Sequence, residues 1–188
     1  MKLGRFDCST GIANILHYNK EEDILVRTST IKDWLIIDKL LNENSNAIGF
    51  IPKTYFEKAV WGGQKNAMVF ICESNNDQVG YVYITPGKKY ASFAKIQQIA
   101  VRDDARRLKY GTALMQVCKE FCIKFGRKGF TLRCRQDLSS NYFWQALGFV
   151  QYGVWEKGRY KRSSRLVASD DINLYKISLN HQIPTLFE

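Results

Sequence analysis

The segment from Ile96 to Phe149 constrains the fold more than any other part of the sequence, because strand-type and helix-type patterns alternate along it without a break. Ile96–Val101 is a short β-type run that ends at a charged turn. After the turn, apolar side chains recur every three or four positions, so the residues there predict a helix with one buried face. A second strand, Phe130–Arg133, and a second helix follow. The expected apolar face of the first helix carries Leu114, Val117, Phe121 and Phe125.

The start of the first helix has the properties of a phosphate site. A helix N-terminus presents unpaired backbone N–H groups and a partial positive charge, and both favour an anion. Arg106, Arg107 and Lys109 add positive charge around the same point. Gly111 has no side chain and would let a bulky anion approach the backbone closely. Together these residues predict a pyrophosphate site, although the same residues read alone would also suit a basic turn that caps a helix.

This part of the sequence resembles the GNAT superfamily of acyl-CoA-dependent N-acyltransferases. In that family the motif Arg/Gln-x-x-Gly-x-Gly/Ala lies between a strand that ends in valine and a helix. Val101, Arg106 and Gly111 fall at the matching positions. Lys109 replaces the first glycine of the motif, which adds a charge and removes a flexible main-chain position.

A second family signature, Phe-Tyr-x-x-Leu-Gly-Phe, matches Phe143–Phe149 with Trp144 in place of the tyrosine. Aromatic and aliphatic residues at this spacing belong to the core of nearly any fold. The resemblance therefore depends on the order of the two signatures and on the helix and strand between them. It implies an acyl-CoA-dependent N-acyltransferase, with acetyl-CoA or another acyl-CoA as the cofactor.

The resemblance also implies which residues hold the cofactor. A backbone N–H near the end of the first strand would contact the thioester carbonyl, and the helix start would hold the pyrophosphate. In the turn before the second helix the family often has an asparagine that contacts the cofactor; Asp137 occupies that position here, and Asn141 is displaced from it. Ser139 or Asp137 would otherwise cap the helix. The cofactor-binding residues expected on this basis are Ile99, Ala100, Val101, Arg106, Arg107, Lys109, Tyr110, Gly111, Thr112 and Asn141.

The general base that the family often carries on this strand is missing from the sequence. Gln97 and Gln98 stand there instead, and an amide cannot accept the proton. Glu57, on an expected helix, and Asp171, on an expected strand, are carboxylates that could serve instead, but the sequence does not place either in a cleft.

The general acid is equally open. The family position is Trp144, whose indole N–H is far too weak an acid to protonate a leaving thiolate. Tyr142, Tyr110 and Cys134 are the nearest titratable substitutes in the sequence. Tyr142 is the candidate catalytic residue, although it precedes Trp144 by two positions and so points to another side of a helix.

The rest of the chain fits the same architecture. The expected order over residues 23–179 is β, α, α, β, β, β, α, β, α, β, β, which is the GNAT order. It implies an α/β (α+β) fold with a central, mixed, mostly antiparallel sheet of about seven strands flanked by about four helices. Residues 1–22 would be an N-terminal extension and residues 180–188 a C-terminal tail. The other elements expected are strands at 23–30, 67–73, 78–85, 150–155 and 171–179, a helix at 31–41 and a helix that begins near Pro52 with Tyr55, Phe56, Ala59 and Val60 on its apolar side.

The chain is strongly basic, with a formal net charge of +10 from 28 Lys and Arg against 18 Asp and Glu. The densest group lies between the two closing strands, close to Trp155. Basic side chains beside aromatic ones recur in nucleic-acid sites, whereas a charged loop can also simply be solvated. In the GNAT fold this loop lies near the acceptor, so the resemblance implies an acidic acceptor: a nucleic acid, an anionic metabolite or a protein. The residues expected on this side are Lys157, Arg159, Tyr160, Lys161, Arg162 and Arg165.

Two functions from different classes follow. The first is an N-acyltransferase that transfers acetyl to an amine of an anionic or nucleic-acid acceptor. The second is a GNAT-like binding module that has lost its acid and base and binds nucleic acid or a protein partner through a basic face. Residues 1–22 show no long apolar core of a signal peptide or membrane span, so we expect a cytoplasmic protein, a monomer or homodimer. The five Cys and two His do not have the spacing of a metal site, so we expect no metal and reduced, mostly buried thiols.

Overall fold

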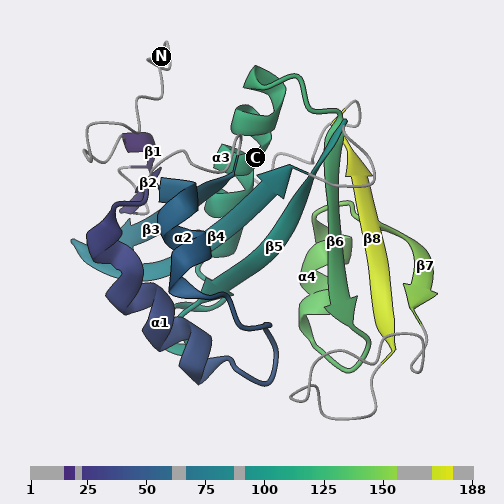
Figure 1. Ribbon diagram of the computed structural model, residues 1–188, viewed down its shortest axis with the longest axis horizontal. Helices are drawn as coiled ribbons and strands as arrows, with labels where there is room; N and C mark the ends of the chain where they lie inside the picture. The colour runs from purple at the N-terminus through teal and green to yellow at the C-terminus, as the bar shows by residue number, and fades with distance from the viewer. Residues whose placement is uncertain (1–14, 20–22, 61–66, 87–91, 156–170, 180–188) are drawn as a thin grey trace.

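The computed structural model describes residues 15–19, 23–60, 67–86, 92–155 and 171–179. In this part of the chain eight strands form one sheet in the order β1-β2-β3-β4-β5-β6-β8-β7 (Figure 1). Neighbouring strands are antiparallel except β5 and β6, which are parallel. The strands are β1 (Ile15–Asn19), β2 (Ile24–Thr28), β3 (Met68–Ser74), β4 (Asp77–Pro86), β5 (Phe93–Val101), β6 (Gly129–Arg135), β7 (Val150–Trp155) and β8 (Ile172–Ser178).

The helices lie on both faces of this sheet (Figure 1). One face is covered by α1 and α2 over β3, β4 and β5, and the opposite face is covered by α3 and α4. Two short 3₁₀ turns, η2 (Ile31–Asp33) and η3 (Asp103–Ala105), precede α1 and α3. The helices are α1 (Trp34–Glu43), α2 (Lys53–Val60), α3 (Tyr110–Lys124) and α4 (Ser140–Ala146).

The expected order of elements is confirmed from β2 to β8, and so is the mixed, mostly antiparallel fold. One strand was not expected. β1 lies within the segment assigned to an N-terminal extension, and it pairs antiparallel with β2 at the edge of the sheet. Its five residues, Ile-Leu-His-Tyr-Asn, are too short and too mixed to show a strand pattern without a partner.

Alternation along the central strands divides the core between the two faces. On β4, Val82 and Ile84 face α3, while Tyr81 and Tyr83 face α1 and α2. The face of α3 is as expected for Leu114, Val117 and Phe121, which are buried against the sheet.

Two expected core positions were wrong. Tyr55 is 52% exposed, because the buried side of the short helix α2 is made by Phe56, Ala59 and Val60 and Tyr55 lies one position off it. Phe125 is 41% exposed, because it follows the last residue of α3 and its ring covers that of Phe121 from outside, with ring centroids 4.5 Å apart.

The cysteines in the described part of the chain, Cys72, Cys118, Cys122 and Cys134, are buried and not in disulfides. Burial raises the pKa of Cys72 and of Cys122 to about 12, so these thiols are protonated at neutral pH.

None of the helices in the described ranges is both long and apolar enough to cross a bilayer.

Candidate functional site

The sheet opens between β5 and β6. These strands pair only through Phe93 with Gly129, Ala94 with Phe130 and Lys95 with Thr131. Beyond these pairs they diverge, as Figure 1 shows, while β5 stays paired with β4 and β6 with β8. The edge of β5 that carries Ile99–Val101 therefore faces the opening with main-chain groups that the sheet does not use.

A β-bulge at Gln97 decides which face of the sheet the later side chains of β5 point to. Ile84 pairs with Ile96 and Tyr83 pairs with Gln98, so Gln97 is the extra residue on β5. The extra residue reverses the alternation of the strand. Ile96 faces α3, and after the bulge Gln98 and Ala100 face α1 and α2 instead. Gln97 itself is exposed, and its Nε2 donates to Thr85 Oγ1 at 2.6 Å.

The N-terminus of α3 lies just beyond the end of β5. Lys109, the residue before the helix, has φ 64° and ψ −1°, the left-handed conformation that glycine adopts without cost. Its carbonyl oxygen accepts the first helical hydrogen bond, from Ala113 N at 3.0 Å. By helix geometry the N–H groups of the three residues between them point out of the helix end. These are Tyr110, Gly111 and Thr112.

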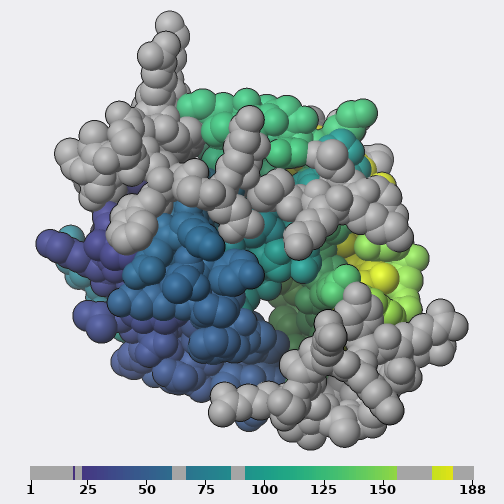
Figure 2. Space-filling model, viewed as in Figure 1, coloured from purple at the N-terminus to yellow at the C-terminus, as the bar shows by residue number. Residues whose placement is uncertain are grey.

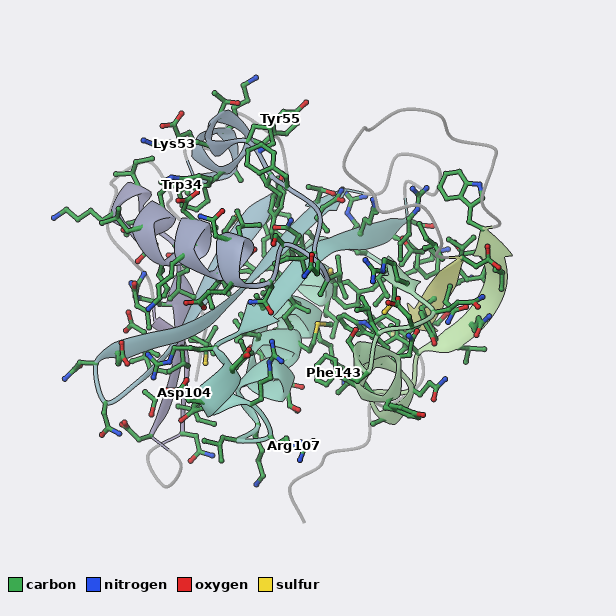
Figure 3. All side chains as sticks on the ribbon, turned by 90° about the horizontal axis from the view of Figure 1, so that it is seen from below. Trp34, Lys53, Tyr55, Asp104, Arg107 and Phe143 are labelled. Atoms are coloured by element: carbon green, nitrogen blue, oxygen red, sulfur yellow. The ribbon has the colours of Figure 1, made fainter. Side chains whose placement is uncertain are left out.

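Three cations surround this helix end. Arg106, Arg107 and Lys109 are all exposed, and Arg107 extends from the loop before α3 in the view of Figure 3. Arg106 Nη2 lies 2.6 Å from Asp103 Oδ1, and both side chains are largely exposed. An exposed ion pair of this kind contributes little to stability.

Gly111 lacks a side chain for a reason the sequence did not indicate. A Cβ at Gly111 would lie 3.2 Å from the ring of Phe143 on α4. The glycine therefore lets α3 and α4 pack closely beside the opening, where Phe143 lies between them (Figure 3).

The two residues considered for the general acid, Trp144 and Tyr142, lie in different surroundings. Trp144 is 5% exposed and packs edge-on against Phe143 and Phe149, with ring centroids 4.9 and 5.3 Å away. Tyr142 is 76% exposed on the solvent side of α4. Beside Trp144, Cys134 Sγ lies 3.3 Å from Ser140 Oγ, and burial raises the pKa of this thiol.

Asn141 forms a buried hydrogen-bonded centre rather than an open contact. Its Nδ2 donates to the carbonyl oxygens of Arg135 and Leu138, each at 2.7 Å. Its Oδ1 accepts from Asn173 Nδ2 at 3.1 Å and from Tyr175 Oη at 3.0 Å. The amide that was expected to bind cofactor is thus engaged with protein, and it joins the turn after β6 to strand β8.

The loop between α1 and α2 closes over the opening, and sequence reasoning did not find this. Gln98 Nε2, on β5, donates to the carbonyl oxygen of Gly49. From the other side, Arg135 Nη1 on β6 donates to the carbonyl oxygen of Asn46 at 2.6 Å. Arg106 Nη2 donates to Asn44 Oδ1 at 2.8 Å. The loop is therefore attached to β5, to β6 and to the loop before α3.

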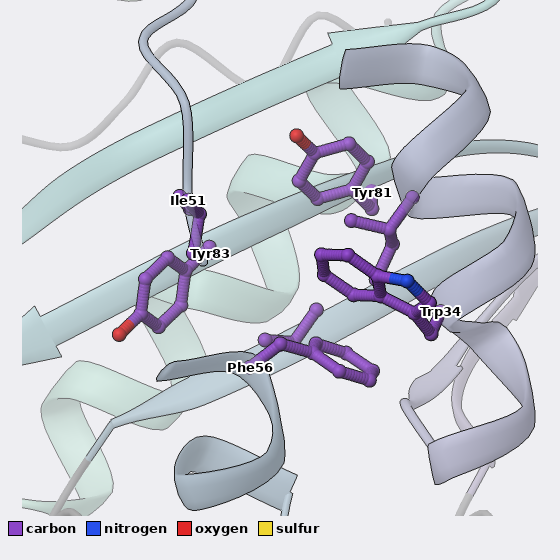
Figure 4. A pocket seen from close by; sticks show the side chains of 7 residues that line it. Trp34, Ile51, Phe56, Tyr81 and Tyr83 are labelled. Atoms are coloured by element: carbon purple, nitrogen blue, oxygen red, sulfur yellow. The ribbon is translucent and has the colours of Figure 1, made fainter. Parts of the chain in front are cut away.

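A very small apolar pocket of about 10 Å³ lies beneath this loop, between the sheet and α1 and α2 (Figure 4). Tyr81 and Tyr83 of β4 enter it from the sheet, and their hydroxyl groups point in different directions. Tyr81 Oη donates to Gln98 Oε1 at 2.9 Å, and burial raises the pKa of Tyr81. The remaining lining residues are Trp34, Ile37, Ile51, Phe56 and Val69.

The basic group expected on the acceptor side, from Lys157 to Arg165, lies outside the described residues.

Two carboxylates were considered as bases. Glu57 lies on α2, where its Oε1 is 3.9 Å from Lys53 Nζ of the same helix. Asp171 precedes β8, and its carbonyl oxygen accepts from Gln136 N at 3.0 Å, so it lies at the end of β6.

Solved structures share this architecture. The ribosomal-protein-S18-alanine N-acetyltransferase from Escherichia coli matches with a TM-score of 0.63 and 15% identity, over 88% of this chain and 99% of that one. An acetyl transferase from Salmonella typhimurium that modifies the N-terminal serine of ribosomal protein L7/L12 matches with a TM-score of 0.67 and 15% identity, over 88% of this chain and 99% of that one. Ard1 from Thermoplasma volcanium matches with a TM-score of 0.67 and 16% identity, over 83% of this chain and 97% of that one. At these identities the likeness shows the fold.

Residues 65–151 match the family model of the acetyltransferase (GNAT) domain. This range includes β3 to α4, and so both edges of the opening and the start of α3. This part of the chain is therefore similar to a GNAT acetyltransferase domain, in agreement with the predicted family and the predicted class of N-acyltransferase. No curated protein sequence matches the chain.

Proposed function

We propose that this protein is an acetyl-CoA-dependent N-acetyltransferase whose acyl site is the opening between β5 and β6. The observation that carries the proposal is the joint position of the strand divergence and the α3 N-terminus within the region that matches the GNAT domain. When bound there, acetyl-CoA supplies an acetyl group already activated as a thioester.

The described residues fit such a molecule. The N–H groups at Tyr110–Thr112 and the three exposed cations before them suit a pyrophosphate. The unpaired edge at Ile99–Val101 can hydrogen-bond an extended amide-bearing arm in the way that a neighbouring strand would. Asn141 is assigned to support the wall of the opening instead of contacting the cofactor.

Positioning and main-chain electrostatics then carry the chemistry. An N–H on the β5 edge can donate to the oxygen that gains negative charge when the amine attacks the thioester carbonyl. Holding the two reactants side by side supplies a large part of the rate enhancement. At the two family positions for a base and an acid, Gln98 holds the α1–α2 loop and Trp144 fills the core, so proton transfer falls to water and to the acceptor itself.

We place the acceptor on the α1 and α2 side of the sheet, where the loop at residues 44–51 forms a wall attached to both edges of the opening. An anionic acceptor fits the net charge of +10.

Calorimetry with acetyl-CoA tests the site. We expect wild type to bind in the micromolar range and the double variant Arg107→Glu/Lys109→Glu to bind at least about tenfold more weakly, because hydrogen bonds to charged groups contribute about 1.5–3 kcal/mol each. Lys32→Glu/Lys39→Glu makes the same charge change at η2 and α1 and should bind as wild type does.

A folded wild-type protein that does not bind acetyl-CoA would contradict the proposal. Binding without release of free CoA across a panel of amines and peptide N-termini would favour the alternative function, a GNAT-like binding module.

A further inference from the structure

A second surface lies outside the acyl site. The face of β6, β8 and β7 that looks toward the α1 and α2 side is not covered by any helix that the structure describes (Figure 1). Parts of β7 and β8 are visible on this face in Figure 2. The strand registers place one set of side chains on it: Thr131, Arg133 and Arg135 of β6, Ile172, Leu174 and Lys176 of β8, and Val150 and Trp155 of β7, joined by Phe93 and Lys95 at the start of β5.

This face is positively charged. Among the strand residues that the registers place there, four are cationic and none is acidic. Arg135 is engaged with Asp137, with Nη2 to Oδ2 2.5 Å, and with the α1–α2 loop, so it belongs to the wall of the opening. Lys95, Arg133 and Lys176 lie on the same face, and Arg133 and Lys176 are exposed.

Aromatic rings lie among these cations. The Arg133 guanidinium is 4.1 Å from the centroid of the Trp155 ring, and Lys176 Nζ is 4.5 Å from that of Phe93. A stacked guanidinium presents a flat, cationic surface. Next to it is a hollow of about 150 Å³, open to solvent and lined by Phe93, Thr131, Tyr152 and Lys176. Tyr152 is half exposed, at the bulge where β7 departs from regular pairing with β8.

We propose that this face binds a segment of single-stranded nucleic acid, with an unstacked base in the hollow beside Tyr152 and phosphates on Lys95, Arg133 and Lys176. Charge alone would suit an acidic peptide equally well. The rings and the stacked guanidinium decide between the two, because every base has a flat π face to stack on them and a carboxylate has none. The Thr131 hydroxyl can donate to or accept from a base edge within the hollow.

The proposal does not depend on acetyl transfer, and its test keeps the two apart. Fluorescence anisotropy with a labelled 12-residue oligouridylate would be measured between 50 and 200 mM NaCl. With three phosphate contacts, log Kobs should fall with log[NaCl] with a slope of about −2, because each contact on a single strand contributes about −0.7. Arg133→Gln/Lys176→Gln should reduce that slope to about −0.7 and weaken binding at least about fivefold.

Two further variants separate charge from stacking. Lys32→Gln/Lys39→Gln removes the same charge from η2 and α1 and should bind the oligonucleotide as wild type does. Tyr152→Ala leaves the charge unchanged and should weaken binding about fivefold or more, since it removes a stacking partner. All four proteins should bind acetyl-CoA alike, which shows that each is folded.

Three results would overturn the proposal: no oligonucleotide binding by wild type at 50 mM NaCl, an equal loss in the face variant and in the η2/α1 control, or full affinity in Tyr152→Ala together with equal binding of a polyglutamate peptide. The last result would assign the face to an acidic polypeptide.

Discussion

Single residues in this protein often have a function that their type does not reveal. Lys109 occupies the position of a family glycine and still adopts the left-handed conformation that glycine favours. The left-handed conformation costs an L-residue about 1–2 kcal/mol, and in return the chain gains a cation at the α3 N-terminus. Asn141 is the opposite case, because an amide expected to contact a ligand is fully used by protein.

Asp33 shows the same dependence on surroundings. It is buried, and its carboxylate accepts two hydrogen bonds from Arg27, from Nη1 at 2.9 Å and from Nη2 at 2.8 Å. Burial by itself would raise the pKa of Asp33, but the bonds from Arg27 and Thr30 outweigh it and the pKa is lowered. Arg27 also binds Glu73, with Nη2 to Oε1 2.6 Å, so the cluster ties β2 to β3 and to the turn before α1.

A lowered pKa in the folded state makes stability depend on pH. The stabilisation from Asp33 is complete above its unfolded-state pKa of about 4 and is lost as pH falls through the lower folded value. We expect Asp33→Asn to destabilise the protein at pH 7 by about 3 kcal/mol, because Arg27 loses one of its buried partners. Urea unfolding at pH 7 and pH 3 should show a smaller acid loss in this variant than in wild type. Asp38→Asn on α1 is the matched control, and an equal acid loss in Asp33→Asn and wild type would contradict the assignment.

At the scale of elements, the sequence was sufficient for the order of strands and helices because each is local. Alternation on β4, the three-or-four spacing on α3 and the turn residues between them are all short-range signals. The positive charge before α3 likewise predicts an anion site at that helix start, and this stays a prediction.

Features that depend on long-range contacts were not predictable. One extra residue in β5 leaves no mark in a sequence that reads Gln97-Gln98, yet it decides which of the two amides reaches Gly49. The α1–α2 loop is attached to Arg106 and to Arg135. The residues of the first pair are 62 positions apart in the sequence, and those of the second pair are 89 positions apart. Such pairs become visible only once the sheet is assembled.

The contact between α3 and α4 gives a prediction at this scale. Gly111→Ala would place a Cβ 3.2 Å from the ring of Phe143, closer than the packing allows without a shift. We expect it to destabilise the protein by roughly 1 kcal/mol, although alanine is the better helix former, because overpacking costs about 1–3 kcal/mol. A double-mutant cycle with Phe143→Leu, followed by thermal unfolding, measures the coupling. Additive effects of the two substitutions would show that the two helices do not press on each other there.

At the scale of the whole molecule, the sheet has two parts, and we propose a different use for each. Its β1–β5 part carries α1 and α2 and one edge of the acyl opening, and its β6–β8–β7 part carries the basic, aromatic face. Strand pairing joins the two parts through only three described residue pairs, between β5 and β6, while contacts across the opening and a shared core against α3 and α4 hold them together.

That narrow junction makes the protein's resistance to unfolding depend on what fills the opening. A molecule bound along the free edge of β5 would contact both β5 and β6 where these strands are not paired with each other. Ligand that binds only the folded state adds about 2.7 kcal/mol at one hundred times its Kd. We expect acetyl-CoA to raise the melting temperature in scanning calorimetry, and Arg107→Glu/Lys109→Glu to lose most of that rise. An unchanged melting temperature at saturating acetyl-CoA would mean that no such stabilisation by acetyl-CoA occurs. If the melting temperature rises, the ligand-free protein is the less stable form, and the concentration of acetyl-CoA sets how much of the protein is protected from unfolding.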